Sequence, residues 1–266
     1  MFTIVAERIN MTRTSIREKV WERDEAFIRS EAAAQAAAGA THIDVNAGGN
    51  PSKEIADMTW LAGVVSDEVS LPLSLDSANP DAIRAGLEIA NRPGTIVNSI
   101  TLERERIENT LPLVREFNTG VICLTMSDEG MPEDYEGRVK LTDEAVKLLS
   151  GHGIQLDRVY LDHLVRPAAT NPGQIRHLLD AVAYTRKTYP EAHVMVGLTN
   201  VSFGVPRRGN LNRAFLAMIV AAGADGAIID PTDPEMMKTL YSARAVLGLD
   251  EYCMEYITKL REMGEA

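Results

Sequence analysis

Carboxylate and primary-amide side chains recur along the sequence, each directly after a short run of apolar residues. A carboxylate accepts paired hydrogen bonds from neighbouring N–H groups, and an amide offers both a donor and an acceptor. Brought together, such side chains would bind a flat heterocycle whose edge alternates donors and acceptors. The polar residues in these positions are Glu7 and Asn10, Asp44 and Asn46, Asp76 and Asn79, Asn98, Thr125, Asp162, Asn200, and Asp230.

Other chemistries fit this set less well. It holds no lysine, which argues against Schiff-base catalysis, and His163 is its only neighbouring histidine, which argues against a metallohydrolase. No metal site is predicted, although Mg²⁺ held by the carboxylates stays open as an alternative. Burying Asp76 and Asp162 without partners would be costly, so pairing with the N–H groups of a ligand such as a pterin explains them. The simpler alternative is that these residues only cap helices and turns.

The apolar runs themselves predict the fold. Eight of them alternate with helical segments at near-even spacing, which is typical of a parallel sheet with crossover helices. A single (β/α)₈ barrel, or TIM barrel, over residues 1–266 is therefore expected, and its strand ends would meet at one mouth. An open doubly wound sheet is the rival. It would carry a glycine-rich phosphate loop after the first strand, and Ala6-Glu7-Arg8-Ile9-Asn10 is not one.

Several connecting segments carry local signals. Asn79 followed by Pro80 predicts a helix start, and Asn171-Pro172 predicts another. Residues 127–140 are polar and marked by glycine and proline, which indicates a mobile lid, with the next helix starting at Thr142. The apolar run of residues 193–198 predicts a buried strand, and the polar residues Thr199 and Asn200 follow it directly. The loop after it carries Arg207 and Arg208, which would either hold the acidic tail of a ligand or face solvent.

The bulk composition excludes some classes of protein. A net charge of −11 argues against a nucleic-acid or anionic-membrane surface. Cys123 and Cys253 lie far apart in the sequence, which is typical of a reduced protein without a thiolate-rich zinc site. Neither a signal peptide nor an apolar run of membrane-spanning length is recognisable. The sequence therefore predicts a cytoplasmic, soluble protein.

The strand-end motifs resemble those of a known family. The chain is similar to the methyltetrahydrofolate:corrinoid protein methyltransferases, which share the pterin-binding barrel with the folate domain of cobalamin-dependent methionine synthase. The resemblance runs through nearly the whole chain in the right order. It rests on Ala6-Glu7-Arg8-Ile9-Asn10, Ile43-Asp44-Val45-Asn46, Leu75-Asp76-Ser77-Ala78-Asn79, Val97-Asn98-Ser99, Tyr160-Leu161-Asp162 and Gly197-Leu198-Thr199-Asn200-Val201-Ser202.

The resemblance implies a function and a set of site residues. The chain would move a methyl group between N5 of 5-methyltetrahydrofolate or tetrahydrofolate and the cobalt of a cobalamin carried by a separate corrinoid protein. Asn200 would be catalytic, because its amide would stabilise the protonated N5 of the leaving pterin. Homodimerisation is also implied. The substrate-binding residues would be Asp76, Asn98 and Asp162 at the pterin ring, Asp44 and Asn46 nearer the pocket floor, and Phe203 and Arg208 in the loop beyond.

The chain departs from the family at one position, and the resemblance leaves some questions open. Phe203 stands where one branch of the family has a glutamine, so it would stack on the folate rather than hydrogen-bond to it. The alternative function is a pterin- or folate-binding barrel without chemistry of its own. A dihydropteroate-synthase-like activity is disfavoured, because no strand-end lysine and Ser-x-Arg loop are found. The direction of methyl transfer and the corrinoid partner stay open.

Overall fold

A computed structural model describes residues 2–264, and its centre is a barrel of parallel strands. The 8-stranded sheet has the order β7-β6-β5-β4-β3-β2-β1-β8, and all of its strand pairs are parallel. The predicted (β/α)₈ barrel is confirmed. The strands are β1 (Thr3–Ala6), β2 (His42–Asn46), β3 (Leu73–Asp76), β4 (Ile96–Thr101), β5 (Gly120–Leu124), β6 (Val159–Asp162), β7 (His193–Val194) and β8 (Gly226–Ile229).

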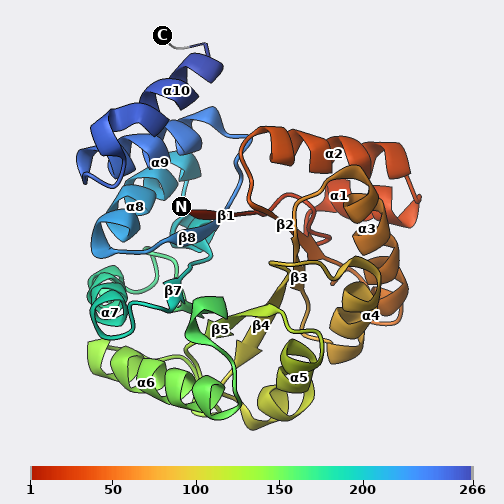
Figure 1. Ribbon diagram of the computed structural model, residues 1–266, viewed down its shortest axis with the longest axis horizontal. Coiled ribbons are helices and arrows are strands. Elements are labelled where there is room, and N and C mark those ends of the chain that lie inside the picture. Colours follow the sequence, from red (N-terminus) through yellow and green to blue (C-terminus); the bar gives the residue numbers. More distant parts are fainter. Residues whose placement is uncertain (1, 265–266) are drawn as a thin grey trace.

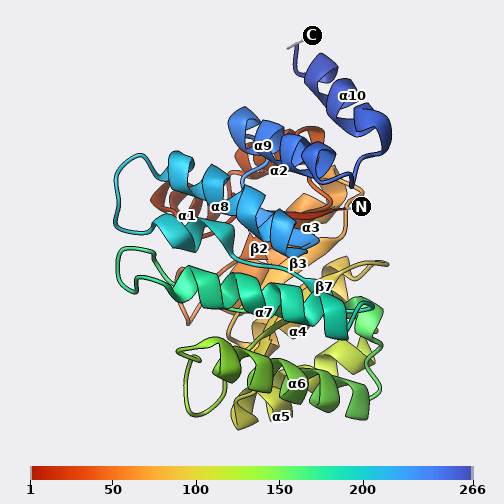
Figure 2. The same ribbon diagram turned by 90° about the vertical axis from the view of Figure 1, so that its left-hand side faces the viewer.

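Helices surround the strands on all sides, and α10 projects from the ring beside α9 (Figure 1). In Figure 2 the loops that follow β5, β6 and β7 project to the left, so the mouth of the barrel lies on that side. The helices are α1 (Thr14–Trp21), α2 (Glu25–Ala37), α3 (Glu54–Glu68), α4 (Pro80–Ala90), α5 (Arg104–Glu116), α6 (Tyr135–Gly151), α7 (Gln174–Thr188), α8 (Arg208–Ala222), α9 (Pro234–Val246) and α10 (Met254–Glu262), with 3₁₀ turns at η1 (Leu156–Arg158), η2 (Leu198–Ser202) and η3 (Glu251–Cys253).

The seventh strand is shorter than the sequence predicts. Regular strand pairing ends at Val194, and the chain then contacts β8 through a single bridge between Gly197 and Ile228. The N–H of Ile228 donates to the carbonyl of Val196 at 2.9 Å, so this segment still closes the barrel. The chain then turns into η2, which contains Asn200. The predicted strand end thus becomes a short 3₁₀ helix at the mouth.

The sequence predicts the start of α4 correctly, whereas α6 and α7 begin elsewhere than expected. Asn79 caps α4, with Pro80 as its first residue, as predicted. The predicted start at Thr142 is wrong, because α6 begins at Tyr135 with the carboxylate of Asp134 accepting from the Gly137 N–H at 2.8 Å. The segment expected to be a lid is therefore helical in its second half. The α7 start is shifted as well, from Asn171-Pro172 to Gln174, after Gly173 in a left-handed conformation.

The barrel interior is filled below the mouth by apolar side chains. Val5, Ile96 and Ile122 come from three strands and form one buried cluster with Met195, which directly follows β7. Larger apolar clusters pack the outer faces of the strands against the helices. The interior is therefore a solid core under the mouth rather than a channel, as expected for this fold. None of the helices in residues 2–264 combines the length and apolar character needed to cross a membrane.

Candidate active site

A polar cavity of about 390 Å³ opens at the mouth of the barrel. Its walls come from residues that follow β1 and β7, from residues within β2, β4 and β8, from the last residue of β3, and from the first residue of α8. Side chains far apart in sequence are thus brought to one place. The lining residues are Glu7, Asn10, Thr12, Arg13, Asp44, Asp76, Asn98, Gly197, Thr199, Asn200, Arg208 and Ile228.

Strand register places the predicted polar residues side by side. Asn46 pairs with Asp76 across β2 and β3, and Asp76 pairs with Asn98 across β3 and β4. Because parallel strands end at the same edge, a shared register aligns their terminal side chains. The amide of Asn46 donates to Asp76 Oδ2 at 2.8 Å, so Asn46 holds the carboxylate rather than lining the cavity.

Asp44 lies at the cavity floor and is almost completely buried. Its Oδ1 accepts from the Ser74 hydroxyl at 2.8 Å and from the Asn98 amide at 3.1 Å. Among residues 2–264, nothing hydrogen-bonds to Asp44 Oδ2 or to Asp76 Oδ1. Both carboxylates therefore keep an acceptor oxygen that the protein itself does not use.

Burial sets the protonation of these two carboxyl groups. It raises the pKa of Asp44 well above its usual range, and the nearby Asp76 charge raises it further. Burial also raises the pKa of Asp76, although the hydrogen bond from Asn46 opposes this shift. Carboxylates in such surroundings gain strongly from a ligand that brings N–H donors, because each donor offsets the cost of burying charge.

Asp162, at the end of β6, is held by the backbone on both of its oxygens. Oδ1 accepts from the Leu164 N–H at 2.7 Å and Oδ2 from the Gly197 N–H at 3.3 Å. Burial raises its pKa to about 6, against the effect of these hydrogen bonds. Asp162 is 5% exposed and does not line the cavity, so a ligand would reach only the remaining lone pairs of its oxygens.

A buried arginine fixes the loop that begins at Asp162. Arg138 of α6 is 1% exposed, and its guanidinium donates to the carbonyl oxygens of His163 and Leu164 and to the side chain of Gln174. His163 itself lies in the core, where its Nε2 is 2.9 Å from the Thr185 hydroxyl and burial lowers its pKa to about 3. His163 therefore packs in the scaffold, away from the cavity.

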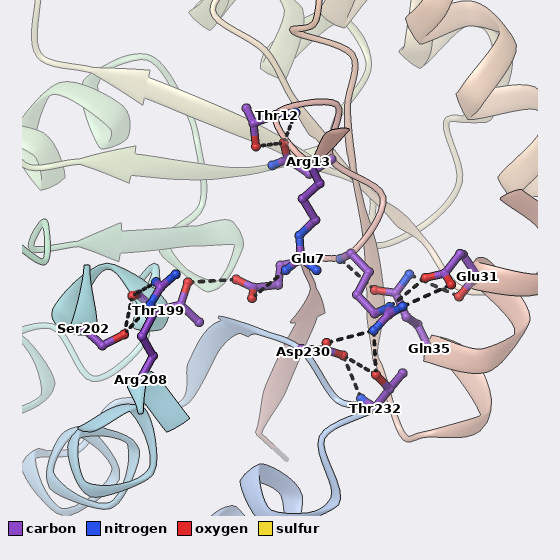
Figure 3. Close-up of polar contacts among 12 residues, drawn as sticks. Glu7, Thr12, Arg13, Glu31, Gln35, Thr199, Ser202, Arg208, Asp230 and Thr232 are labelled. Atoms are coloured by element: carbon purple, nitrogen blue, oxygen red, sulfur yellow. Dashed lines mark hydrogen bonds and ion pairs between the residues drawn. The ribbon is translucent and has the colours of Figure 1, made fainter. Parts of the chain in front are cut away.

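On the opposite side of the mouth, charged side chains form a connected series (Figure 3). Arg13 contacts Glu7, with Nη2 and Oε1 3.2 Å apart. The Thr199 hydroxyl donates to the other oxygen of Glu7 at 3.2 Å. Arg208 donates to the Thr199 carbonyl at 2.7 Å and to the Ser202 hydroxyl at 2.9 Å. Glu7 thus links the first strand to the η2 turn.

Asn200 lies on the cavity wall next to this series. Its side chain is exposed and makes no hydrogen bond within the described part of the chain. Gly197 leaves space for it, since a Cβ at Gly197 would lie 3.2 Å from Asn200 Nδ2. The amide is therefore free to contact a molecule in the cavity, with both a donor and an acceptor to offer.

Phe203 lies outside the cavity lining, and its stacking on the folate stays a prediction. Its side chain is 67% exposed, and it does not line the cavity. The residue follows η2 in an extended backbone conformation. No described residue covers the ring. Arg208, from the same loop region, does line the cavity as expected.

Sequence reasoning gave no role to several residues of the cavity. The sequence places Glu7 and Thr199 at strand ends but gives neither a role, and it does not indicate Arg13 or Thr12. The signal for Thr199 was its place directly before Asn200. Arg13 follows β1 by several residues, and only its contact with Glu7 reveals it. Within residues 2–264, His, Cys, Asp and Glu side chains form no group of three or more suited to a metal ion.

Comparison with known proteins supports what the geometry indicates. Residues 6–230 match the family model described as "Pterin binding enzyme". The "Methylcorrinoid:tetrahydrofolate methyltransferase" of Eubacterium limosum is 33% identical over 261 residues, which is 97% of this chain and 96% of that protein. The "Methionine synthase" of Mycobacterium leprae is 30% identical over 188 residues, which cover 66% of this chain and only 15% of that protein.

Solved structures with low sequence identity share the fold. A dihydropteroate synthase of Xanthomonas albilineans superimposes with a TM-score of 0.70 at 17% identity, over 93% of both chains. A DHPS of Yersinia pestis gives a TM-score of 0.66 at 17% identity, over 82% of this chain and 88% of the other. These matches confirm the barrel, and the family match confirms the resemblance inferred from the strand ends. The chain belongs to the family of pterin-binding enzymes.

Proposed function

We propose that this protein is a methyltransferase that moves a methyl group between N5 of tetrahydrofolate and the cobalt of a corrinoid on a separate protein. The observation that carries the proposal is the near-full-length identity of 33% to the Eubacterium limosum enzyme whose name states that reaction. The polar cavity supports it, because its walls match the donor and acceptor pattern of a pterin.

The carboxylates recognise the pyrimidinone side of the pterin. Asp76 and Asp162 accept hydrogen bonds from its amino and ring N–H groups, and Asn98 contributes its amide oxygen, while Asp44 and Asn46 hold these groups from below. The uncommitted oxygen of Asp76 supports this assignment. A charged hydrogen bond of this kind contributes about 1.5–3 kcal/mol to binding.

Asn200 acts at the other end of the ring. Methyl transfer away from N5 would leave a strongly basic nitrogen anion unless N5 is protonated in the transition state. The Asn200 carbonyl oxygen stabilises the protonated N5 by accepting its hydrogen bond, which is electrostatic catalysis by a preorganised dipole. An amide does not titrate near neutral pH, so Asn200 orients the proton and does not supply it. The free state of its side chain supports this role.

The corrinoid is held by a partner protein and supplies or accepts the methyl group at its cobalt. It meets this chain at the barrel mouth, where the methylated nitrogen faces outward. Arg208 binds the acidic tail of the folate at the rim of the cavity. Phe203, whose exposed ring lies beside the mouth, contacts the folate or the partner protein.

We also infer that residues 1–266 form one domain, that the protein is cytoplasmic, and that it forms homodimers without binding nucleic acid or membranes. The net charge of −11 and the free thiols of Cys123 and Cys253 support these inferences. Size-exclusion chromatography with light scattering tests the dimer, which should give twice the mass of 29.1 kDa.

A spectroscopic assay tests the proposed reaction. Purified protein is mixed with cob(I)alamin and 5-methyltetrahydrofolate, and in a second experiment with methylcobalamin and tetrahydrofolate, while the cobalamin absorbance is followed. We expect protein-dependent transfer in at least one direction. Folate binding measured by calorimetry without transfer in either direction would instead support a binding barrel without chemistry.

Substitution of Asn200 separates these two functions. For Asn200→Ala we expect a modest loss of folate affinity, within about tenfold, and a loss of transfer rate of about 100-fold or more. Equal losses in both measurements would contradict a catalytic role for the amide.

A further inference from the structure

Glu7 is a charged residue of the cavity to which the family resemblance assigned no role. Its carboxylate follows β1 directly, its side chain is 17% exposed, and it lines the cavity. It contacts Arg13 through one oxygen and the Thr199 hydroxyl through the other, both at 3.2 Å (Figure 3). A carboxylate accepts up to about four hydrogen bonds, so Glu7 can bind a further donor from the cavity.

Barrel topology places Glu7 beside Asn200. The bridge between Gly197 and Ile228 joins the β7 end to β8, and Ala6 pairs with Ile229 across β8 and β1. Glu7 follows β1 and Thr199 follows the β7 end, with β8 between them, and their side chains are in contact. Thr199 directly precedes Asn200, so Glu7 and Asn200 line the same side of the cavity.

Asp76 and Asn98, two of the residues proposed to recognise the pyrimidinone, lie across the mouth on β3 and β4. Asp162, the third, ends β6 next to the β7 end, where its Oδ2 accepts from the Gly197 N–H at 3.3 Å. A pterin bound through these residues directs the opposite edge of its bicycle, which carries N5, toward the β7–β8–β1 side of the mouth. On this side of the cavity, Glu7 contributes a carboxyl group and Asn200 contributes a free amide.

We propose that Glu7 is the acid–base residue that exchanges the N5 proton of the folate during methyl transfer. This inference rests on the proposed function, and it adds the proton carrier that Asn200 cannot be. Glu7 would touch N5 directly, while Asn200 stabilises the protonated nitrogen from the side.

The proton balance is simple in both directions. When the methyl group moves to tetrahydrofolate, the N5 lone pair forms the new N–C bond and the carbon–cobalt bond breaks with its electron pair left on cobalt. The Glu7 carboxylate takes the N5 proton, and the N–H electron pair returns to nitrogen. In reverse, the Glu7 carboxyl donates its proton to N5 while the N–C bond breaks and the cobalt electron pair forms the bond to carbon.

Three other titratable groups near the cavity do not contribute to its β7–β8–β1 wall. Asp162 has both oxygens bonded to backbone N–H groups, and Asp44 lies on the floor, bonded to Ser74 and Asn98. His163 is buried in the scaffold and bonded to Thr185. Of Glu7, Asp44, Asp162 and His163, only Glu7 places its carboxylate on the cavity wall at the β7–β8–β1 side.

The charges around Glu7 keep its proton exchangeable. Burial raises its pKa, and Arg13 opposes that shift. General acid–base catalysis is most effective when the pKa of the group approaches the working pH. The charged and hydrogen-bonding groups that face Glu7 are Arg13 before α1, Thr199 in η2, Arg208 in α8, Asp230 after β8 and Asp44 in β2.

The test compares Glu7→Gln with a matched control, Glu88→Gln, which changes an exposed glutamate of α4 away from the mouth. Methyl transfer from 5-methyltetrahydrofolate to cob(I)alamin is measured in a single turnover, and folate affinity is measured by calorimetry. We expect the Glu7→Gln rate to fall about 100-fold or more, with folate affinity within about threefold of the wild type. Glu88→Gln should match the wild type in both measurements.

The outcomes separate this inference from the proposed function. If the wild-type protein transfers no methyl group, the proposed function fails. If the wild type is active and Glu7→Gln retains its rate, or loses rate and affinity equally, the inference about Glu7 is overturned.

The pH profile provides a second, independent measurement that does not need Glu7→Gln to fold. Transfer from 5-methyltetrahydrofolate requires protonated Glu7, so the wild-type rate should fall as pH rises through the Glu7 pKa. Arg13→Gln removes a cation that holds this pKa down, and its rate profile should shift to higher pH. An unshifted profile would contradict the proposed role.

Discussion

The two ends of the barrel hold their carboxylates in opposite ways. At the base, Asp225 precedes β8 and accepts from His193 Nδ1 at 2.8 Å, from the Val194 N–H at 2.8 Å and from Arg186 at 3.4 Å. Burial alone would raise the pKa of Asp225, but the hydrogen bonds from His193 and the Val194 N–H lower it. At the mouth, burial raises the pKa of Asp44 and Asp76, and no cation among residues 2–264 lies within hydrogen-bond distance of either.

This difference separates stability from function. A carboxylate whose pKa is lowered in the folded protein stabilises the fold, because the folded state favours its charged form. A carboxylate whose pKa is raised destabilises the fold at neutral pH, and the protein retains it only if something else gains from it. The ion pairs of Asp225 with His193 and Arg186 at the base of the barrel are therefore structural. The carboxylates of Asp44 and Asp76 at the mouth are available to a ligand that brings N–H donors.

The largest expected effect comes from truncating a mouth carboxylate. Asp76→Ala should weaken folate binding about 100-fold, because a charged hydrogen bond to the pterin is lost and its donors stay buried. Calorimetric titration with tetrahydrofolate measures this, and Asp225→Asn at the base serves as the control with unchanged affinity. Similar losses in both variants would remove the distinction between the two ends.

The reverse pattern is expected for stability. Asp225→Asn should lower the free energy of unfolding by about 2 kcal/mol, because it leaves His193 and Arg186 without their charged partner. The melting temperature would fall by about 6 °C for a domain of this size.

The stabilisation by this pair also has a pH window. The hydrogen bond to Asp225 raises the pKa of His193, so its contribution is lost as pH rises through that folded value. The lowered pKa of Asp225 gives a contribution that is lost as pH falls through its own folded value. The gap in melting temperature between wild type and Asp225→Asn should therefore be widest in mildly acidic buffer. A gap independent of pH would contradict the ion pair.

Folate binding should weaken in acid for a reason specific to the mouth. In the proposed complex Asp162 accepts from N–H donors as a carboxylate, and burial raises its pKa to about 6 in the free protein. Below that pH, its proton must be released on binding, so affinity should fall by up to about tenfold for each further pH unit. Calorimetry in a pH series measures the slope, and Asp162→Asn should flatten it. A slope that persists in this variant would assign the effect to another carboxyl group.

The smallest expected effect is a gain in stability when Asp44, on the cavity floor, is replaced. Asp44→Asn removes a buried carboxyl whose pKa is raised, while its amide oxygen can still accept from Ser74. A raised folded pKa costs stability as pH rises, so the variant should match the wild type near pH 4. It should gain about 1 kcal/mol at pH 8, or about 3 °C in melting temperature. Loss of stability at pH 8 would show that Asp44 is a structural residue.

Sequence periodicity was sufficient for the barrel, because apolar runs and caps such as Asn79 with Pro80 are local signals. It failed at α6, where Asp134 caps the helix several residues before Thr142, because a polar first turn does not differ in composition from a loop. Strand-end position predicts that Asp44, Asp76, Asn98 and Asn200 lie around one cavity, but it does not predict that backbone N–H groups hold Asp162 outside the lining. The contact of Arg13 with Glu7, and the exposure of Phe203, depend on loop conformation, which no periodic pattern encodes.

The most direct measurement of the central claim is the structure of the protein with bound 5-methyltetrahydrofolate. We expect the pyrimidinone edge within hydrogen-bond distance of Asp76, Asn98 and Asp162, and N5 beside Asn200 and Glu7 on the other side of the mouth. A folate bound outside this cavity, or with its pyrimidinone edge facing away from these carboxylates, would contradict the account.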